Sequence, residues 1–123
     1  YVEDAIARTF APQTAPEGYA DHLGPALTLR RKSLRANAKQ RANLLDEIEA
    51  LHTRYGEISV PTEILHGDAD DTVALTLHSA NLANQIPAAH LTVLPGVGHM
   101  LHHAEPDEIV AAIDRAAARA GLR

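Results

Sequence analysis

Two short apolar stretches of this chain are each followed by a residue that could do acid–base chemistry. Residues 60–65 run into a loop that contains Asp70, and residues 91–94 run into a turn that contains His99. In a parallel α/β sheet, the residues that carry chemistry lie in loops at the carboxyl ends of the strands. A carboxylate bound to one imidazole nitrogen leaves the other nitrogen free to take a proton from a nucleophile or a water. The sequence therefore predicts that Asp70 and His99 form the acid–histidine half of a catalytic triad.

Taken one at a time, the two residues also fit structural roles. The aspartates at 68, 70 and 71 precede an expected helix, where they could cap free N–H groups and meet the positive end of the helix dipole. His99 alone fits a solvated loop histidine, although Gly96 and Gly98 permit a tight turn that lets its imidazole reach a neighbouring strand end. It is the pairing of the two loops that favours the catalytic interpretation.

The pattern after residue 58 predicts the elements that would position this pair. A strand, a helix and a second strand are expected over residues 60–66, 73–85 and 90–94. Thr72 is the expected N-cap of the middle helix, and a last helix should begin at Pro106 and stop at Gly121. Because the link between the strands has room for a helix, we expect parallel strands with a right-handed crossover.

The first part of the chain reads as helices broken by loops. Helices are expected over residues 2–9, 25–36 and 38–53, with a loop over residues 11–18. The predicted organisation is thus a helical cap or lid segment over residues 1–55 and a βαβα unit over residues 56–123.

Two parallel strands do not make a stable sheet alone, because parallel sheets need covered faces and neighbouring strands. One edge of the pair must dock on something that this sequence does not encode. Either the chain is the C-terminal piece of a larger α/β domain, or it associates with itself. A start at Tyr1 instead of Met favours the first of these interpretations.

Composition argues against several other classes of function. The net charge is −5 at pH 7, which disfavours nucleic acid and anionic membranes as partners. No cysteine is present, so disulfides, thiolate catalysis and cysteine-based zinc sites are excluded. No apolar run is long enough to span a bilayer and no export signal is visible, so we expect a cytoplasmic location.

Residues 58–119 resemble the C-terminal part of the α/β-hydrolase fold superfamily. The resemblance is carried by two stretches, VPTEILHGDADDTV at 60–73 and LPGVGHM at 94–100. It implies that Asp70 supports the histidine, that His99 is the general base, and that Met100 lines the substrate pocket.

Residues 1–55 resemble, more loosely, the helical cap that these enzymes insert before the penultimate strand. The implied fold class is α/β, a C-terminal fragment of a hydrolase sheet preceded by cap-like helices. The implied activity is hydrolysis of a small-molecule substrate by a serine-type esterase, lactonase or similar enzyme. Neither a metal nor an organic cofactor is expected.

The nucleophile of that family has no match in this sequence. The family usually places a serine in Gly-x-Ser-x-Gly upstream, and Ser33, Ser59 and Ser79 lack glycines at that spacing. Loss of a triad nucleophile lowers turnover by about a million-fold in a reference protease, so we expect the chain alone to be inert. Members that use an aspartate nucleophile remain open. The non-catalytic alternative is a homo-oligomer or domain-swapped assembly formed through the unpaired sheet edge.

Two metal-dependent interpretations are weaker. Asp68-Ala-Asp70-Asp-Thr72 matches the Asp-x-Asp-x-Thr motif of haloacid-dehalogenase-type phosphotransferases, but a His-Gly turn precedes it and no lysine follows it. His99 and His103 would share one face of a helix, as a transition-metal site could require. However, Gly98 and Pro106 bound a loop, so loop histidines near an active-site mouth are expected instead.

A basic run without an intervening acid precedes the cap's longest helical stretch. It could attract an anionic substrate or nucleic acid, but the run lacks aromatic residues that could stack on bases. A solvated helix face is therefore the expected role of Arg30, Arg31, Lys32, Arg35, Lys39 and Arg41.

Overall fold

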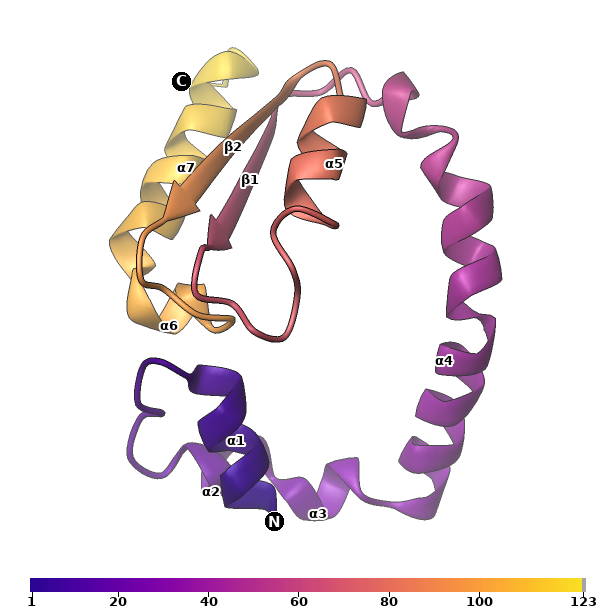
Figure 1. Cartoon of the computed structure of the whole chain (residues 1–123), viewed down its shortest axis with the longest axis vertical. Helices are drawn as coiled ribbons and strands as arrows, with labels where there is room; N and C mark the ends of the chain where they lie inside the picture. The colour runs from indigo at the N-terminus through magenta and orange to yellow at the C-terminus, as the bar shows by residue number, and fades with distance from the viewer. Residues whose placement is uncertain (123) are drawn as a thin grey trace.

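The computed structural model describes residues 1–122, apart from the side chain of Thr28; Arg123, the last residue of the predicted 56–123 unit, lies outside the described residues. Its two strands, β1 (Thr62–Gly67) and β2 (Ala89–Leu94), are parallel neighbours in one open sheet, as predicted. The pairing runs from Thr62 opposite Ala89 to Gly67 opposite Leu94. Both strands therefore end at the same edge, and the loops that follow them start side by side (Figure 1).

Helices surround this edge and the sheet. The short α5 and the C-terminal α7 pack against the strands, whereas α1 and α2 lie beyond the carboxyl ends of the strands (Figure 1). In chain order the helical elements are α1 (Val2–Phe10), α2 (Tyr19–Leu23), α3 (Pro25–Thr28), α4 (Arg31–His52), the 3₁₀ turn η1 (Tyr55–Glu57), α5 (Ser79–Gln85), α6 (Leu101–Ala104) and α7 (Pro106–Arg119). No helix in the described range 1–122 has the length and apolar character needed to cross a membrane.

The helix expected over residues 73–85 is wrong in its first six residues, because α5 begins only at Ser79. Asp70, and not Thr72, caps the preceding turn: its Oδ1 accepts the N–H groups of Thr72 and Val73 at 2.7 and 2.9 Å. The Val73 carbonyl is bound by a ring nitrogen of His66 at 3.0 Å, so it does not start a helix. Side chains of the candidate site thus hold these residues in a loop.

The helices of residues 1–55 also divide differently from the prediction. The break lies at Leu29 and Arg30, where the backbone of Arg30 is extended, and α4 then runs unbroken for 22 residues. Alanines at 36 and 38 favour helix at the position where a boundary was expected.

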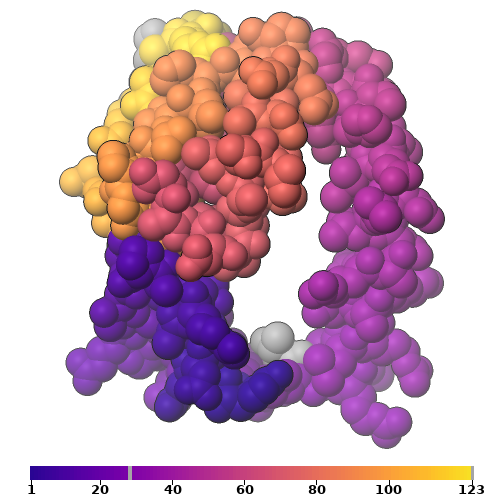
Figure 2. All heavy atoms as spheres, viewed as in Figure 1, coloured from indigo at the N-terminus to yellow at the C-terminus, as the bar shows by residue number. Residues whose placement is uncertain are grey.

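The chain leaves much apolar surface uncovered. None of the described residues of α4 is buried, and Figure 2 shows open space along the middle of this helix. Ile113 of α7 is 59% exposed. The accessible surface is 8975 Å², against about 6,400 Å² for a compact monomer of 13.2 kDa. The uncovered leucines and isoleucines of α4 are Leu34, Leu44, Leu45, Ile48 and Leu51.

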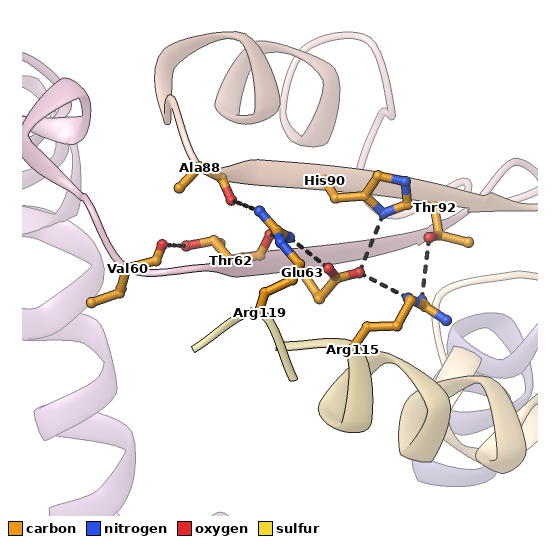
Figure 3. A network of polar contacts seen from close by, with 8 residues as sticks. All are labelled: Val60, Thr62, Glu63, Ala88, His90, Thr92, Arg115 and Arg119. Carbon is orange, nitrogen blue, oxygen red and sulfur yellow. Dashed lines mark hydrogen bonds and ion pairs between the residues drawn. The ribbon is translucent and has the colours of Figure 1, made fainter. Parts of the chain in front are cut away.

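A buried carboxylate fastens α7 to the start of the sheet. The side chain of Glu63 on β1 is only 5% exposed, and its oxygens accept hydrogen bonds from Arg115 at 3.1 Å and Arg119 at 2.7 Å (Figure 3). His90 of β2 lies 3.3 Å away, and Arg119 also binds the Ala88 carbonyl. Burial raises the pKa of Glu63, but the bonds from Arg119, Arg115 and His90 outweigh it, and the pKa lies below its ordinary value.

We expect Glu63→Gln to lower the free energy of unfolding at pH 7 by about 1–2 kcal/mol, because both arginines lose a charged acceptor. Since the folded pKa is lowered, this stabilisation is present above the ordinary pKa and is lost as pH falls through the folded value. Urea unfolding across that acidic range measures the effect. Glu57→Gln is the control, since Glu57 pairs with Arg54 on the surface and should change stability by less than about 0.5 kcal/mol. Equal losses in the two variants would contradict this account of Glu63.

Candidate active site

The two residues expected to form the acid–histidine pair are in direct contact. Nδ1 of His99 lies 2.9 Å from Oδ2 of Asp70, across the loops that follow β2 and β1. An ionised carboxylate only accepts hydrogen bonds, so Nδ1 carries the proton and donates it. Nε2 of neutral His99 then holds a lone pair, and it has no hydrogen-bond partner among the residues that the structure describes. The His99 side chain as a whole is 34% exposed.

The Asp70 carboxylate is buried and fully engaged. Its side chain is 4% exposed, with Oδ2 turned to His99 and Oδ1 to the N–H groups of Thr72 and Val73. Burial raises the pKa of Asp70, but the hydrogen bonds from His99, Val73 and Thr72 lower it by a larger amount. The pKa therefore lies below its ordinary value. Asp70 is therefore ionised at neutral pH. One oxygen of Asp70 caps the turn and the other binds the imidazole of His99.

The two loops are held together by backbone contacts at the sheet edge. A Cβ on Gly67 would collide with the Val97 carbonyl, so only glycine allows this approach. The Val97 carbonyl accepts the N–H of Ala69 at 3.0 Å, and Oδ1 of Asp68 accepts the N–H of Gly96 at 2.6 Å. These contacts hold the loop that carries Asp70 beside the turn that carries His99.

His66, which the sequence analysis did not single out, also contacts the loop that carries Asp70. Its ring is buried, with Nδ1 2.6 Å from Oγ of Ser79 and Nε2 3.0 Å from the Val73 carbonyl. A carbonyl only accepts, so Nε2 carries the proton and Nδ1 accepts from the serine hydroxyl. Asp70 lies 3.8 Å from this Nε2 and binds the N–H of the same Val73 residue. His66 therefore binds the carbonyl and Asp70 the N–H of the same loop residue, Val73.

Met100 is the residue that the resemblance implies for the substrate pocket. It borders an apolar cavity of about 370 Å³ formed with α1, α2 and the segment around α3. A volume of this size is typical of small-molecule sites. Other lining residues include Ile6, Phe10, Tyr19, Leu23 and Leu29.

The other histidines of this region lie near α6. Within the described part of the chain, no three side chains of the metal-binding types gather at one point. The ring of His103 instead packs on those of Phe10 and Tyr19, with centroids 5.3 Å apart in both cases. His103 thereby joins α6 to α1 and α2.

No serine of the described chain is hydrogen-bonded to His99. Oγ of Ser79 binds His66, and Oγ of Ser33 binds the Leu27 carbonyl at 3.2 Å. No known protein-family model matches the chain, and no curated protein matches it. The case for function therefore depends on the site geometry.

We expect Asp70→Asn to lower the free energy of unfolding at pH 7 by about 1–3 kcal/mol, because charge-assisted bonds to His99 and two N–H groups are lost. The lowered pKa of Asp70 means that its stabilisation is present above the ordinary pKa and disappears as pH falls through the folded value. The difference in the free energy of unfolding between wild type and Asp70→Asn should therefore become smaller in acid. Urea unfolding at pH 7 and at acidic pH measures this difference. The exposed neighbour supplies a control, Asp71→Asn, which should unfold like wild type at both pH values. A difference in the free energy of unfolding that does not depend on pH would contradict this role of the Asp70 carboxylate.

Proposed function

We propose that this chain supplies the general base and the orienting acid of an α/β-hydrolase that cleaves an ester, a lactone or a related small substrate. The observation that carries the proposal is the hydrogen bond of 2.9 Å between His99 and a buried Asp70 at the carboxyl ends of adjacent parallel strands. Asp70 precedes His99 in the chain, which is the order of the acid and the base after the nucleophile in this class.

In this proposal Nε2 of His99 takes a proton from the attacking nucleophile and gives it to the leaving alkoxide. It then takes a proton from the hydrolytic water and returns it to the nucleophile as the acyl bond to the enzyme breaks. Asp70 holds the ring in the required tautomer and stabilises the imidazolium that forms. The apolar cavity beside Met100 receives an apolar group of the substrate, and α1 and α2 wall it. The residues that stabilise the developing oxyanion are contributed by the segment that carries the nucleophile.

The nucleophile is proposed to come from polypeptide outside these 123 residues. Two features support this origin. The sheet has only two strands, with an unpaired edge on each side. The accessible surface also exceeds that of a compact monomer by about 2,500 Å², much of it on apolar faces such as α4. A segment that pairs with the sheet and covers these faces would complete both the core and the site.

The test is to express the complete reading frame of the gene beside the 123-residue chain and assay both with p-nitrophenyl esters. We expect turnover by the longer product and none by the chain alone. In the longer product, His99→Ala should lower kcat by about a million-fold, and Asp70→Asn by about ten-thousand-fold.

His102→Ala serves as the matched control, since this exposed neighbouring histidine makes no bond to Asp70, and it should leave kcat/KM unchanged. Full activity of the His99→Ala variant would sink the proposal. Turnover by the chain alone that His99→Ala abolishes would instead show that its nucleophile lies within residues 1–123.

For the substrate pocket, we expect Met100→Ala to raise KM for a p-nitrophenyl hexanoate by about tenfold, because apolar contact with the acyl chain is lost. The KM for the acetate should change little, since a short acyl chain does not fill the cavity. Steady-state kinetics of the longer product measure both values. Met100→Leu keeps an apolar side chain of similar volume, so its KM for the hexanoate should be close to that of wild type. An equal change for hexanoate and acetate would exclude Met100 from acyl-chain binding.

A further inference from the structure

A side chain from the cap segment binds the turn that carries His99. Nε2 of Gln13 donates to the Gly96 carbonyl at 2.8 Å, and Oε1 of Gln13 accepts the N–H of Gly98 at 2.9 Å. One amide thus satisfies a donor and an acceptor two residues apart, as a neighbouring strand would. Gly98 directly precedes His99 and lies 85 residues after Gln13 in the sequence.

The backbone approach at this point is too close for any residue but glycine. A Cβ on Gly98 would collide with the carbonyl oxygen of Ala11 and would lie 3.0 Å from the ring of Pro12. Residues 11–13 therefore press directly on the turn, and the segment after α1 meets the loop after β2 (Figure 1). The preceding residue, Phe10, is buried and packs on His103, which anchors this segment beside the site.

The turn needs such support because its position decides the contact between His99 and Asp70. The backbone of residues 95–98 has one exposed glycine in the left-handed region, Gly96 at φ +69°. Asp68 and Ala69 hold the turn from the β1 side, through the N–H of Gly96 and the carbonyl of Val97. Gln13, from the segment after α1, binds two further groups of the turn, the Gly96 carbonyl and the Gly98 N–H.

We propose that Gln13 is a positioning residue, which fixes the 95–98 turn and thereby keeps Nδ1 of His99 in hydrogen-bond contact with Oδ2 of Asp70. The role rests on the proposed function, in which His99 is the base. Gln13 acts through the backbone of the turn, and the cap segment contributes to the geometry of the base as well as to the substrate pocket.

The experiment follows the Asp70–His99 bond by NMR in the labelled 123-residue chain, so it does not depend on turnover. In Gln13→Ala we expect the Gly98 amide to exchange with solvent about tenfold faster, because one hydrogen bond is lost. We also expect the carboxyl-carbon titration of Asp70 to move up toward the ordinary pKa, and the Hδ1 signal of His99 to weaken, because the bond between the two side chains loosens. Thr14→Ala, at an exposed adjacent position, should match wild type in all three measurements.

A folded Gln13→Ala protein whose Asp70 titration and His99 signals equal those of wild type would overturn the proposal. If Gln13→Ala does not fold, Gln13→Glu decides by the same readings. Its carboxylate can still accept from Gly98 but cannot donate to Gly96, so Gly98 should stay protected while the Asp70 titration moves. An unmoved titration in that variant overturns the proposal as well. A missing hydrolase activity would refute the proposed function but leave these readings unchanged.

Discussion

The close approach of two strand-end loops is the constraint on which the rest of this structure depends. Parallel pairing brings Gly67 and Leu94 to the same edge, and the missing side chain of Gly67 lets the Val97 carbonyl lie against it. Only with the loops this close can a ring from one and a carboxylate from the other share a hydrogen bond of 2.9 Å. A larger residue at 67 would separate the loops and thereby the acid from the base.

Charge burial explains why so many polar contacts gather there. A carboxylate that is 4% exposed has lost most of its water, and this cost must be offset by donors within the protein. Asp70 finds three, one imidazole and two N–H groups. The N–H groups use Oδ1 and leave Oδ2 to His99, so the same bonds that stabilise the anion also direct it. Near the other end of β1, the buried Glu63 carboxylate is likewise stabilised by two arginines. These ion pairs link α7 to the sheet.

Much of this arrangement could be predicted from the sequence, and the parts that could not have a common cause. The strands, their parallel direction and the meeting of Asp70 with His99 follow from short-range patterns and from chain order. The late start of α5 was missed because His66 binds the Val73 carbonyl, a contact that no periodicity encodes. Gln13 was missed because it meets Gly98 across 85 residues of intervening chain. An amide in a loop carries no local signal of its partner.

The acid–histidine half-site is assembled entirely by contacts within the described chain. Asp70 is held by the loop it begins, and His99 by bonds that reach its turn from Asp68 on one side and Gln13 on the other. None of these bonds requires a nucleophile, and Nε2 of His99 has no hydrogen-bond partner among the described residues. Preorganisation of this kind spares the reaction the cost of arranging its base. Under the proposed function, the polypeptide that supplies the nucleophile would meet an imidazole that Asp70 already holds in place.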